Sequence, residues 1–282
     1  LLIHDDIMDH AELRRGQPTA HVVFRELHEA RRLRGSAESF GGSVAILVGD
    51  LAYALAFELF GQALTAAAQA SSPGLERLQR SFSAMCQEVI GGQYLELSIA
   101  HRAVPEGPPG ETLERELLEV LRLKSGRYTA ERPIELGALL AGAAPEVSEA
   151  LARYGRAVGE AFQLQDDLLG VFGDASRVGK PVGADLVEGK LTFLIYHALR
   201  LSSPGQRSAL VGTLGSSAAS AADLERAAGI LEETGARRAV EEMVEARLTA
   251  ARQALDLVAG RLGSEGGAAL SELIEHLRGR EA

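Results

Sequence analysis

Two clusters of aspartates stand far apart in the chain, each in apolar surroundings that are typical of a helix. The first cluster is Asp5, Asp6 and Asp9, and the second is Asp166 and Asp167. Because residues three or four apart share a helix face, each cluster directs its carboxylates to one patch. Such like charges destabilise a helix by roughly 0.2 to 0.5 kcal/mol per pair unless a cation lies between them. The clusters therefore predict a site for divalent cations.

The ligand types indicate which cation this is. Neither cluster has a cysteine beside it, and oxygen ligands of this kind favour Mg²⁺, with Mn²⁺ as the alternative, over zinc. We expect His4 and His10, which flank the first cluster, to orient or pack rather than to bind metal. Mg²⁺ held by few carboxylates usually completes its shell with water and a substrate phosphate. The sequence therefore predicts a phosphate-bearing substrate.

A phosphate substrate needs basic partners, and the basic residues show an unusual bias. Of the 29 basic residues only three are lysines, Lys124, Lys180 and Lys190, while Arg14 and Arg15 follow the first aspartate cluster. An ammonium group meets a phosphate oxygen as a compact point charge, which a guanidinium does not replace. We expect all five side chains to bind diphosphate.

Several motifs occur together in one order between Leu1 and about Thr192. They are the segments 5–9 (DDIMD), 14–19 (RRGQPT), 92–93 (GQ), 124–125 (KS), 162–167 (FQLQDD), 179–180 (GK) and Lys190. This series resembles the trans-isoprenyl diphosphate synthases, or polyprenyl synthetases. The resemblance covers some two thirds of the chain and rests on several independent motifs.

The resemblance implies a fold and an activity. The fold is all-α: a single-domain bundle of long helices around a central apolar cavity, the isoprenoid synthase fold, spanning residues 1–282. Because the chain opens at Leu1 inside an expected helix, we expect further N-terminal helices upstream. The activity is Mg²⁺-dependent condensation of isopentenyl diphosphate with an allylic diphosphate: dimethylallyl, geranyl or farnesyl diphosphate.

The same resemblance implies roles for individual residues. Metal binding falls to Asp5, Asp6, Asp9, Asp166 and Asp167. Substrate binding falls to Arg14, Arg15, Gln93, Lys124, Gln163, Lys180 and Lys190. Catalytic roles fall to Lys124, Ser125, Gln163 and Lys190. Many family members carry a third aspartate where this chain has Gly170, which is a departure from the pattern.

Product length in the family depends on the bulk of the residues just before the first aspartates. Here Leu1 stands four residues before Asp5, and an aliphatic side chain forms a deeper pocket floor than an aromatic one. We therefore expect the C20 product, geranylgeranyl diphosphate, with C15 or longer chains as alternatives.

Composition limits the remaining classes. A net charge of −10 with scattered basic residues argues against nucleic-acid binding. A single cysteine, Cys86, excludes an internal disulfide and favours a reducing cytoplasm. We find no apolar run of the ~18 to 20 residues that a membrane span needs, so we expect none.

The helical pattern gives further expectations. Residues 36–60 are apolar almost all round, which is typical of a buried helix; the resemblance places a homodimer interface near it, and Asp50 is expected to be hydrogen-bonded in the core. Gly91 and Gly92 indicate a close approach of another element. Residues 112–141 are expected to form a helix that is broken at Gly126 and Pro133. Within this range, Glu131, Arg132 and Glu135 are expected to be solvated surface residues.

Two other functions share parts of this pattern. A class I terpene cyclase has the first aspartate cluster, but its second metal motif combines Asn or Asp with Ser or Thr and then Glu. The chain contains no Asn, and none of its aspartates begins that pattern. A non-catalytic regulatory subunit of a prenyl synthase keeps the fold but would be expected to lose aspartates or basic residues, and here only position 170 departs.

Overall fold

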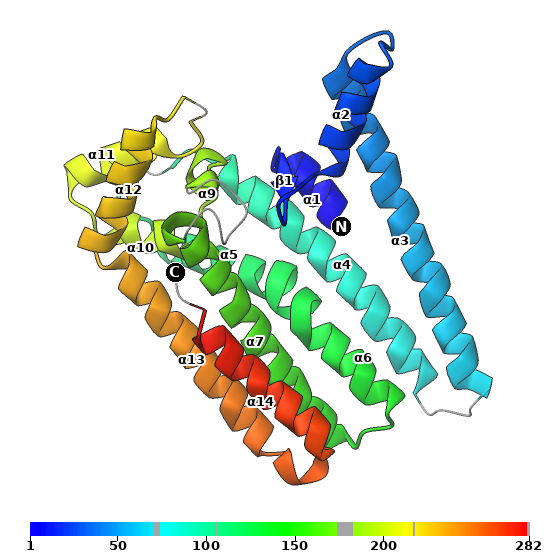
Figure 1. Ribbon diagram of the computed structural model, residues 1–282. Helices are drawn as coiled ribbons and strands as arrows, with labels where there is room; N and C mark the ends of the chain where they lie inside the picture. The colour runs from blue at the N-terminus through cyan, green and yellow to red at the C-terminus, as the bar shows by residue number, and fades with distance from the viewer. Residues whose placement is uncertain (70–73, 105–106, 174–182, 217, 281–282) are drawn as a thin grey trace. The chain divides into compact units, whose positions relative to one another are not determined.

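The computed structural model describes residues 1–69, 74–104, 107–173, 183–216 and 218–280 (Figure 1). Its contacts define two compact units, an N-terminal unit within residues 1–71 and a C-terminal unit within residues 72–282. The described residues of both units are helical apart from one two-stranded hairpin. The predicted all-α class is confirmed. That the whole chain forms one domain stays a prediction.

The N-terminal unit consists of three helices and the hairpin. The elements are α1 (Leu2–Met8), β1 (Leu13–Arg14), β2 (Gln17–Pro18), α2 (Ala20–Ala30) and α3 (Ala37–Gln69). The strands pair antiparallel, with Leu13 opposite Pro18 and Arg14 opposite Gln17. Arg15 and Gly16 between them have φ values of +53° and +73°, the pattern of a tight type I′ hairpin turn. This turn reverses the chain directly after Arg14, whose side chain pairs with Asp5 and Asp6 of α1.

Helix α3 differs from what its composition predicts. Its small residues Gly41, Ala45 and Gly49 are buried. A Cβ at Gly41 would collide with backbone of α2, and one at Gly49 with the ring of His4 in α1. Large apolar side chains on other faces of α3 are exposed, among them Leu47 and Leu51 at 65% and 61%. The expected buried helix is therefore wrong: only the small residues are covered within this unit.

Helix α3 also bears on the expectation that the chain has no membrane span, which stays a prediction. Among the described residues, one helix, α3, is long enough and apolar enough to cross a bilayer, with a mean hydropathy of 1.8 over its best window. The sequence reading missed it because small residues interrupt the strongly apolar ones. Length and composition alone do not distinguish a span from an interface helix, because both present apolar side chains outward.

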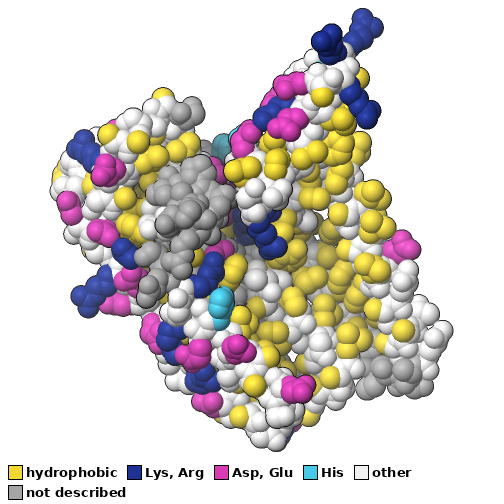
Figure 2. Space-filling view, in the orientation of Figure 1, with side chains coloured by type: hydrophobic (Ala, Val, Ile, Leu, Met, Phe, Trp, Pro, Cys, Tyr) yellow, Lys and Arg dark blue, Asp and Glu magenta, His cyan; other side chains and the backbone are white. Residues whose placement is uncertain are grey.

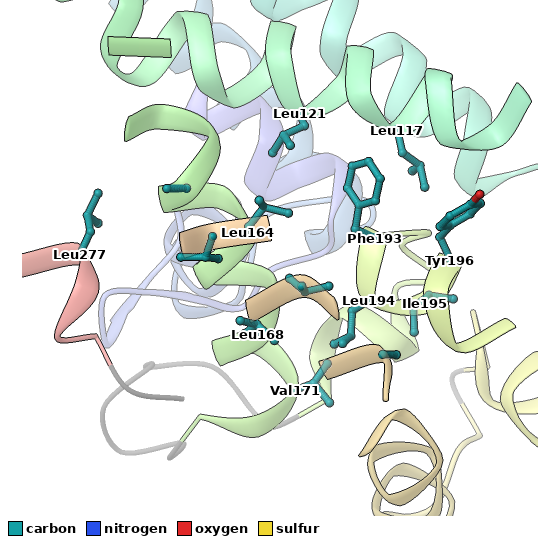
Figure 3. Packing of buried hydrophobic residues seen from close by; sticks show 14 of the residues in the cluster. Leu117, Leu121, Leu164, Leu168, Val171, Phe193, Leu194, Ile195, Tyr196 and Leu277 are labelled. Atoms are coloured by element: carbon teal, nitrogen blue, oxygen red, sulfur yellow. The ribbon is translucent and has the colours of Figure 1, made fainter. Parts of the chain in front are cut away.

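The C-terminal unit contains the remaining helices. They are α4 (Leu75–Ala100), α5 (Glu111–Val120), η1 (Leu121–Glu131), α6 (Arg132–Leu140), α7 (Pro145–Phe172), α9 (Ala184–Val187), α10 (Phe193–Leu201), α11 (Pro204–Thr213), α12 (Ala221–Glu233), α13 (Ala236–Asp256), η2 (Ala259–Arg261) and α14 (Ser264–Arg278). Helix α7 is central, with η1, α6, α9, α10, α13 and α14 against it. Figure 3 shows side chains of α7, including Leu164 and Leu168, in one apolar cluster with Phe193 and Leu194 of α10. This core anchors the helix that carries the second aspartate cluster.

Segment η1 is a π-helix between α5 and α6. The predicted break at Gly126 and Pro133 does not occur. The chain stays helical, and Pro133 lies in the first turn of α6, where a missing N–H is tolerated. Widening the turn shifts the direction of side chains relative to an α-helix, and π-segments are frequent at functional sites. Lys124 and Ser125 lie in this segment.

Glycines let η1 approach its neighbours almost backbone to backbone. A Cβ at Gly92 of α4 would lie 2.6 Å from the backbone nitrogen of Lys124. A Cβ at Gly159 of α7 would lie 2.6 Å from the carbonyl oxygen of Gly126. Real Cβ contacts are essentially never below 3.0 Å. The close approach predicted at Gly92 is confirmed, whereas Gly91 has open space beside it.

Replacing Gly159 with alanine tests this packing. Because the added methyl group meets rigid backbone, Gly159→Ala should lower the free energy of unfolding by about 1 to 3 kcal/mol, measured from the urea midpoint. Gly137→Ala on α6 is the matched control, since its Cβ would meet nothing within 4 Å and alanine gains roughly 0.5 to 1 kcal/mol in a helix. Equal effects of the two substitutions would contradict the packing argument.

Candidate active site

In the N-terminal unit, the hairpin brings a guanidinium onto the first aspartate cluster. Arg14 donates to Asp6 Oδ1 through Nε at 2.7 Å, and its Nη2 lies 3.5 Å from Asp5 Oδ2. Asp6 is buried, whereas Asp9 is half-buried at the end of α1 and Arg15 is exposed at the hairpin turn. The structure therefore joins Arg14 to two of the three predicted aspartates and leaves Arg15 at the surface.

His4 packs on α3, which is one of the two roles predicted for it. Its Nε2 lies 3.3 Å from both the carbonyl oxygen of Ile46 and Oδ1 of Asp50. The Asp50 side chain is 65% exposed, so the expectation that it is hydrogen-bonded in a core is wrong. Apolar side chains near it on α3, such as Leu47 and Leu51, are also exposed.

In the C-terminal unit, a chain of hydrogen bonds links η1 to the second aspartate cluster. Ser125 Oγ donates to Gln163 Oε1 at 2.7 Å, and Gln163 Nε2 donates to Asp167 Oδ1 at 2.8 Å. Gln163 and Asp167 are one turn apart on α7, whereas Ser125 comes from η1 and is buried. The three predicted site residues thus form one connected group, and the serine fixes which way the amide points.

Lys124 forms an ion pair across the same interface. Its ammonium donates to Glu96 on α4, and both side chains are mostly covered, at 19% and 23% exposed. Gln93 lies one turn before Glu96 on α4 and is half-buried. The sequence reading missed Glu96, although its spacing of three residues from Gln93 could have indicated a shared helix face.

Asp167 lies in an unfavourable electrostatic environment for an anion. Burial raises the pKa of its carboxyl well above the usual range, and the nearby charges of Asp185, Glu96 and Asp166 raise it further. The hydrogen bond from Gln163 acts in the opposite direction and lowers it. A cation beside Asp167 would relieve this repulsion.

Asp166 is held by the end of the chain. Arg280 Nη2 donates to Asp166 Oδ1 at 2.9 Å, and the same guanidinium lies over the ring of Phe162, 5.0 Å from its centre. Arg280 follows α14, more than a hundred residues from the aspartates in sequence. Sequence reasoning missed it, and no motif around Arg280 could have found it.

The segment after α7 supplies the third predicted lysine. Lys190 Nζ lies 2.8 Å from Glu188 Oε2 and 3.9 Å from Asp185 Oδ1. Its backbone N–H donates to the carbonyl of Asp185. Lys180 lies outside the described residues, so its predicted role stays a prediction. Asp185 is a further residue that the sequence reading missed.

The predicted solvated surface of η1 and α6 is wrong. Glu131 is buried, with Arg156 donating to both of its oxygens at 2.6 and 2.9 Å. Arg132 bonds Glu88 and Glu135. These ion pairs link α4, η1, α6 and α7. They therefore help to fix the positions of the helices that carry the site residues.

The donor set suits Mg²⁺ but is not assembled around one point. Among the residues that the structure describes, no three His, Cys, Asp or Glu side chains converge as a metal site. Instead the carboxylates bind cationic or amide groups of the protein: Asp6 binds Arg14, Asp166 binds Arg280, and Asp167 binds Gln163. Carboxylate oxygens are the ligands that a hard divalent cation prefers, and such a cation would offset the repulsion between the negative charges. The carboxylates of Asp166 and Asp167 thus have the chemistry that Mg²⁺ prefers, and their role as metal ligands stays a prediction.

The polyprenyl synthetase family model matches residues 1–231. The chain belongs to the polyprenyl synthetase family. A short chain isoprenyl diphosphate synthase of Methanocaldococcus jannaschii is 34% identical over 82% of this chain and 61% of that protein. A (2E,6E)-farnesyl diphosphate synthase of Mycobacterium tuberculosis is 33% identical over 100% of this chain and 70% of its own. Relatives of similar identity thus carry names for different product lengths.

Solved structures of the family confirm the isoprenoid synthase fold. A geranylgeranyl pyrophosphate synthase from Corynebacterium glutamicum, crystallised with isoprenyl diphosphate and magnesium, has a TM-score of 0.86 and 36% identity. The match covers 99% of this chain and 75% of that one. The chain thus spans between about three fifths and three quarters of the length of these family members.

The pair of Glu96 and Lys124 can be tested by a double-mutant cycle. We expect Glu96→Gln and Lys124→Gln to show a coupling of about 1 to 2 kcal/mol in the free energy of unfolding, because both partners are largely covered. The control pair is Glu76 and Arg80, exposed by 83% and 74% on the same helix, which should couple by less than about 0.5 kcal/mol. Additive effects at Glu96 and Lys124 would refute an energetic link between α4 and η1.

Proposed function

We propose that the protein is a Mg²⁺-dependent prenyltransferase that condenses isopentenyl diphosphate with an allylic diphosphate to give a longer all-trans prenyl diphosphate. The observation that carries this proposal is the connected group of Ser125, Gln163 and Asp167 beside Lys124, on elements that the family pattern assigns to catalysis. Buried, free Cys86 supports a reducing, cytoplasmic location. The crystal structure of the Corynebacterium relative, with isoprenyl diphosphate and magnesium, supports the substrate and metal classes.

The residues of the site have distinct tasks in this reaction. When bound, Mg²⁺ supplies the positive charge that stabilises the departing diphosphate. Arg14 in the N-terminal unit and Lys124 in the C-terminal unit would each supply positive charge for binding diphosphate oxygens. Gln163 holds the Asp167 carboxylate in place, and Ser125 holds Gln163. The C–O bond between the allylic carbon and its diphosphate breaks, and the double bond of isopentenyl diphosphate attacks that carbon. The adduct then loses a proton to the released diphosphate, which leaves a chain longer by one five-carbon unit.

We also propose that the product is geranylgeranyl diphosphate. Leu1 lies half-buried directly before α1, whose following turns carry Asp5 and Asp6. An aliphatic side chain at this position leaves more depth for the growing chain than a ring would. The allylic substrate, which donates the prenyl group, would be dimethylallyl, geranyl or farnesyl diphosphate, each extended to the same final length.

An elongation assay with the full-length protein tests the activity. With Mg²⁺, labelled isopentenyl diphosphate and each of the three allylic diphosphates, we expect a C20 product. Asp5→Ala and Asp166→Ala should each lower the rate by about a thousandfold or more, because a loss of roughly 4 kcal/mol in transition-state stabilisation corresponds to that factor. Asp256→Ala on α13, an exposed aspartate outside the site, is the control and should leave the rate unchanged.

Other outcomes of this assay would replace the proposal. Diphosphate released with a hydrocarbon, and no elongation, would indicate a terpene cyclase. Bound substrates without turnover would indicate a non-catalytic regulatory subunit. A C15 or C25 product would keep the reaction and correct the chain length.

We further propose that the protein is a homodimer whose interface includes α3. The N-terminal unit leaves a row of leucines on α3 uncovered, at every fourth position. Figure 2 shows hydrophobic side chains along this helix. Their exposed fractions are 49% or more. The row consists of Leu47, Leu51, Leu55 and Leu59.

Light scattering coupled to size exclusion tests the dimer. Leu51→Glu should shift the protein from dimer to monomer, because a charge placed in an apolar interface is left unpaired. Leu257→Glu is the control: Leu257 is 69% exposed just after α13, and the substitution should keep the dimer. A wild-type monomer would overturn the proposal, and sedimentation of the wild-type protein with lipid vesicles would assign α3 to a membrane instead.

A further inference from the structure

Lys190 directly follows a close contact between two backbones. A Cβ built at Gly189 would lie 3.1 Å from Cα and 3.3 Å from the nitrogen of Gly215, in the turn after α11. Separations of 3.0 to 3.4 Å are tighter than nine in ten real Cβ contacts. Both contacting atoms of Gly215 belong to the backbone, so neither can swing away as the end of a side chain can. A side chain at position 189 would therefore have to displace one of the two segments.

A shared carbonyl group joins the same two segments. The carbonyl oxygen of Leu186, near the end of α9, accepts from the N–H of Gly215 at 2.9 Å and from the N–H of Gly189 at 3.2 Å. The last carbonyls of a helix have no partner within that helix, and here the turn after α11 supplies one. The Leu186 side chain is buried in the main hydrophobic core together with Leu210 of α11. The turn and the end of α9 are thus attached to one another and to the core.

The way in which α9 ends determines where the backbone of Lys190 lies. Its N–H donates to the carbonyl of Asp185 at 3.0 Å. Together with the bond that Gly189 donates, this forms a Schellman motif, a helix end that needs one left-handed residue. Gly189 is that residue, with φ of +73°. Lys190 is therefore held at its backbone by the same motif that packs against Gly215.

The side chain of Lys190 is held over the same short segment. Its Nζ lies 2.8 Å from Oε2 of Glu188 and 3.9 Å from Oδ1 of Asp185, and 17% of the side chain is exposed. Helix α9 itself packs on α7, which carries Asp166 and Asp167. A displacement at the end of α9 would therefore move the ammonium group relative to the second aspartate cluster.

We propose that the contact between Gly189 and Gly215 positions Lys190 for binding diphosphate, which makes both glycines positioning residues. The inference rests on the proposed function, in which Lys190 binds a diphosphate group of the substrates. The contact limits how the end of α9 can lie against the turn after α11, and Lys190 follows one residue later. None of the predicted site residues lies in the turn after α11, so its part in the site follows from the packing alone.

Alanine at either glycine tests this inference. Binding of inorganic diphosphate to the full-length protein with Mg²⁺ is measured by isothermal titration calorimetry, and circular dichroism establishes that each variant is folded. Gly189→Ala should weaken binding by about tenfold, because its methyl group meets the backbone of Gly215 and a displaced ammonium loses a hydrogen bond to a charged group. Gly215→Ala should weaken binding in the same direction, because φ is +70° there and alanine is strained in that conformation.

Gly235→Ala is the control for backbone strain. Gly235 precedes α13 with φ of +76°, and a Cβ there would meet nothing within 4 Å. The substitution thus introduces the same left-handed alanine without a contact to α9, and it should change the affinity for diphosphate by less than about twofold. An equal loss in Gly235→Ala and Gly189→Ala would contradict the proposal.

A double-mutant cycle with Lys190 separates positioning from a general structural effect. Lys190→Ala should weaken diphosphate binding by about tenfold or more, because it removes a charged hydrogen-bond donor. If Gly189 acts through Lys190, adding Gly189→Ala to Lys190→Ala should change the affinity by less than about twofold. The same loss from Gly189→Ala in both backgrounds would overturn the proposal, as would wild-type affinity in folded Gly189→Ala, Gly215→Ala or Lys190→Ala. If Gly189→Ala does not fold, the same cycle is made with Gly215→Ala.

Failure of this inference is distinguishable from failure of the proposed function. If the wild-type protein elongates prenyl diphosphates but folded Gly189→Ala binds diphosphate normally, only the positioning role is wrong. If the wild-type protein shows no elongation while the cycle shows the expected coupling, the positioning of Lys190 is correct and the activity is wrong.

Discussion

The site in the C-terminal unit depends on one packing constraint: η1 lies so close to both α4 and α7 that side chains cannot separate the backbones. Gly92 on α4 and Gly159 on α7 provide the contact points on the two sides. Interiors packed at this density transmit displacement rather than absorb it. The position of Lys124 against Glu96, and of Ser125 against Gln163, follows from this contact. A residue with a Cβ at either glycine would move both pairs at once.

A second constraint comes from the negative charge that the site concentrates. Carboxylates of Glu96, Asp166 and Asp185 surround Asp167, and each of the three bonds or faces a cationic side chain of the protein. These internal pairs offset the repulsion that would otherwise oppose folding. A metal ion bound at these carboxylates would have to compete with the protein's own cations, so its net affinity would be smaller than its direct interaction with the carboxylates.

The sequence predicted this chemistry well where it depends on residue type and local spacing. The types and spacing of Ser125, Gln163 and Asp167 are local signals, and these three side chains do form one hydrogen-bonded group. Of the two glycines, Gly92 makes the predicted close approach and Gly91 does not. Predictions that depend on tertiary contacts were wrong or absent. A glutamate is usually exposed, but Glu131 is buried because Arg156, from a different helix, pairs with its carboxylate. Arg280 and Asp185 have no local signal, because their partners lie in other elements.

Helix α3 shows why composition alone assigns such segments poorly. A helix that is apolar all round predicts burial, a membrane span or an interface equally well, because each environment removes apolar surface from water. What separates the faces of α3 is side-chain size. Gly41, Ala45 and Gly49 face α2 and α1, where close approach requires small residues, while the leucines remain uncovered within the unit. Burying them can add stability at about 25 cal/mol per Å² of apolar surface, which gives an apolar partner for this helix a thermodynamic reason to bind.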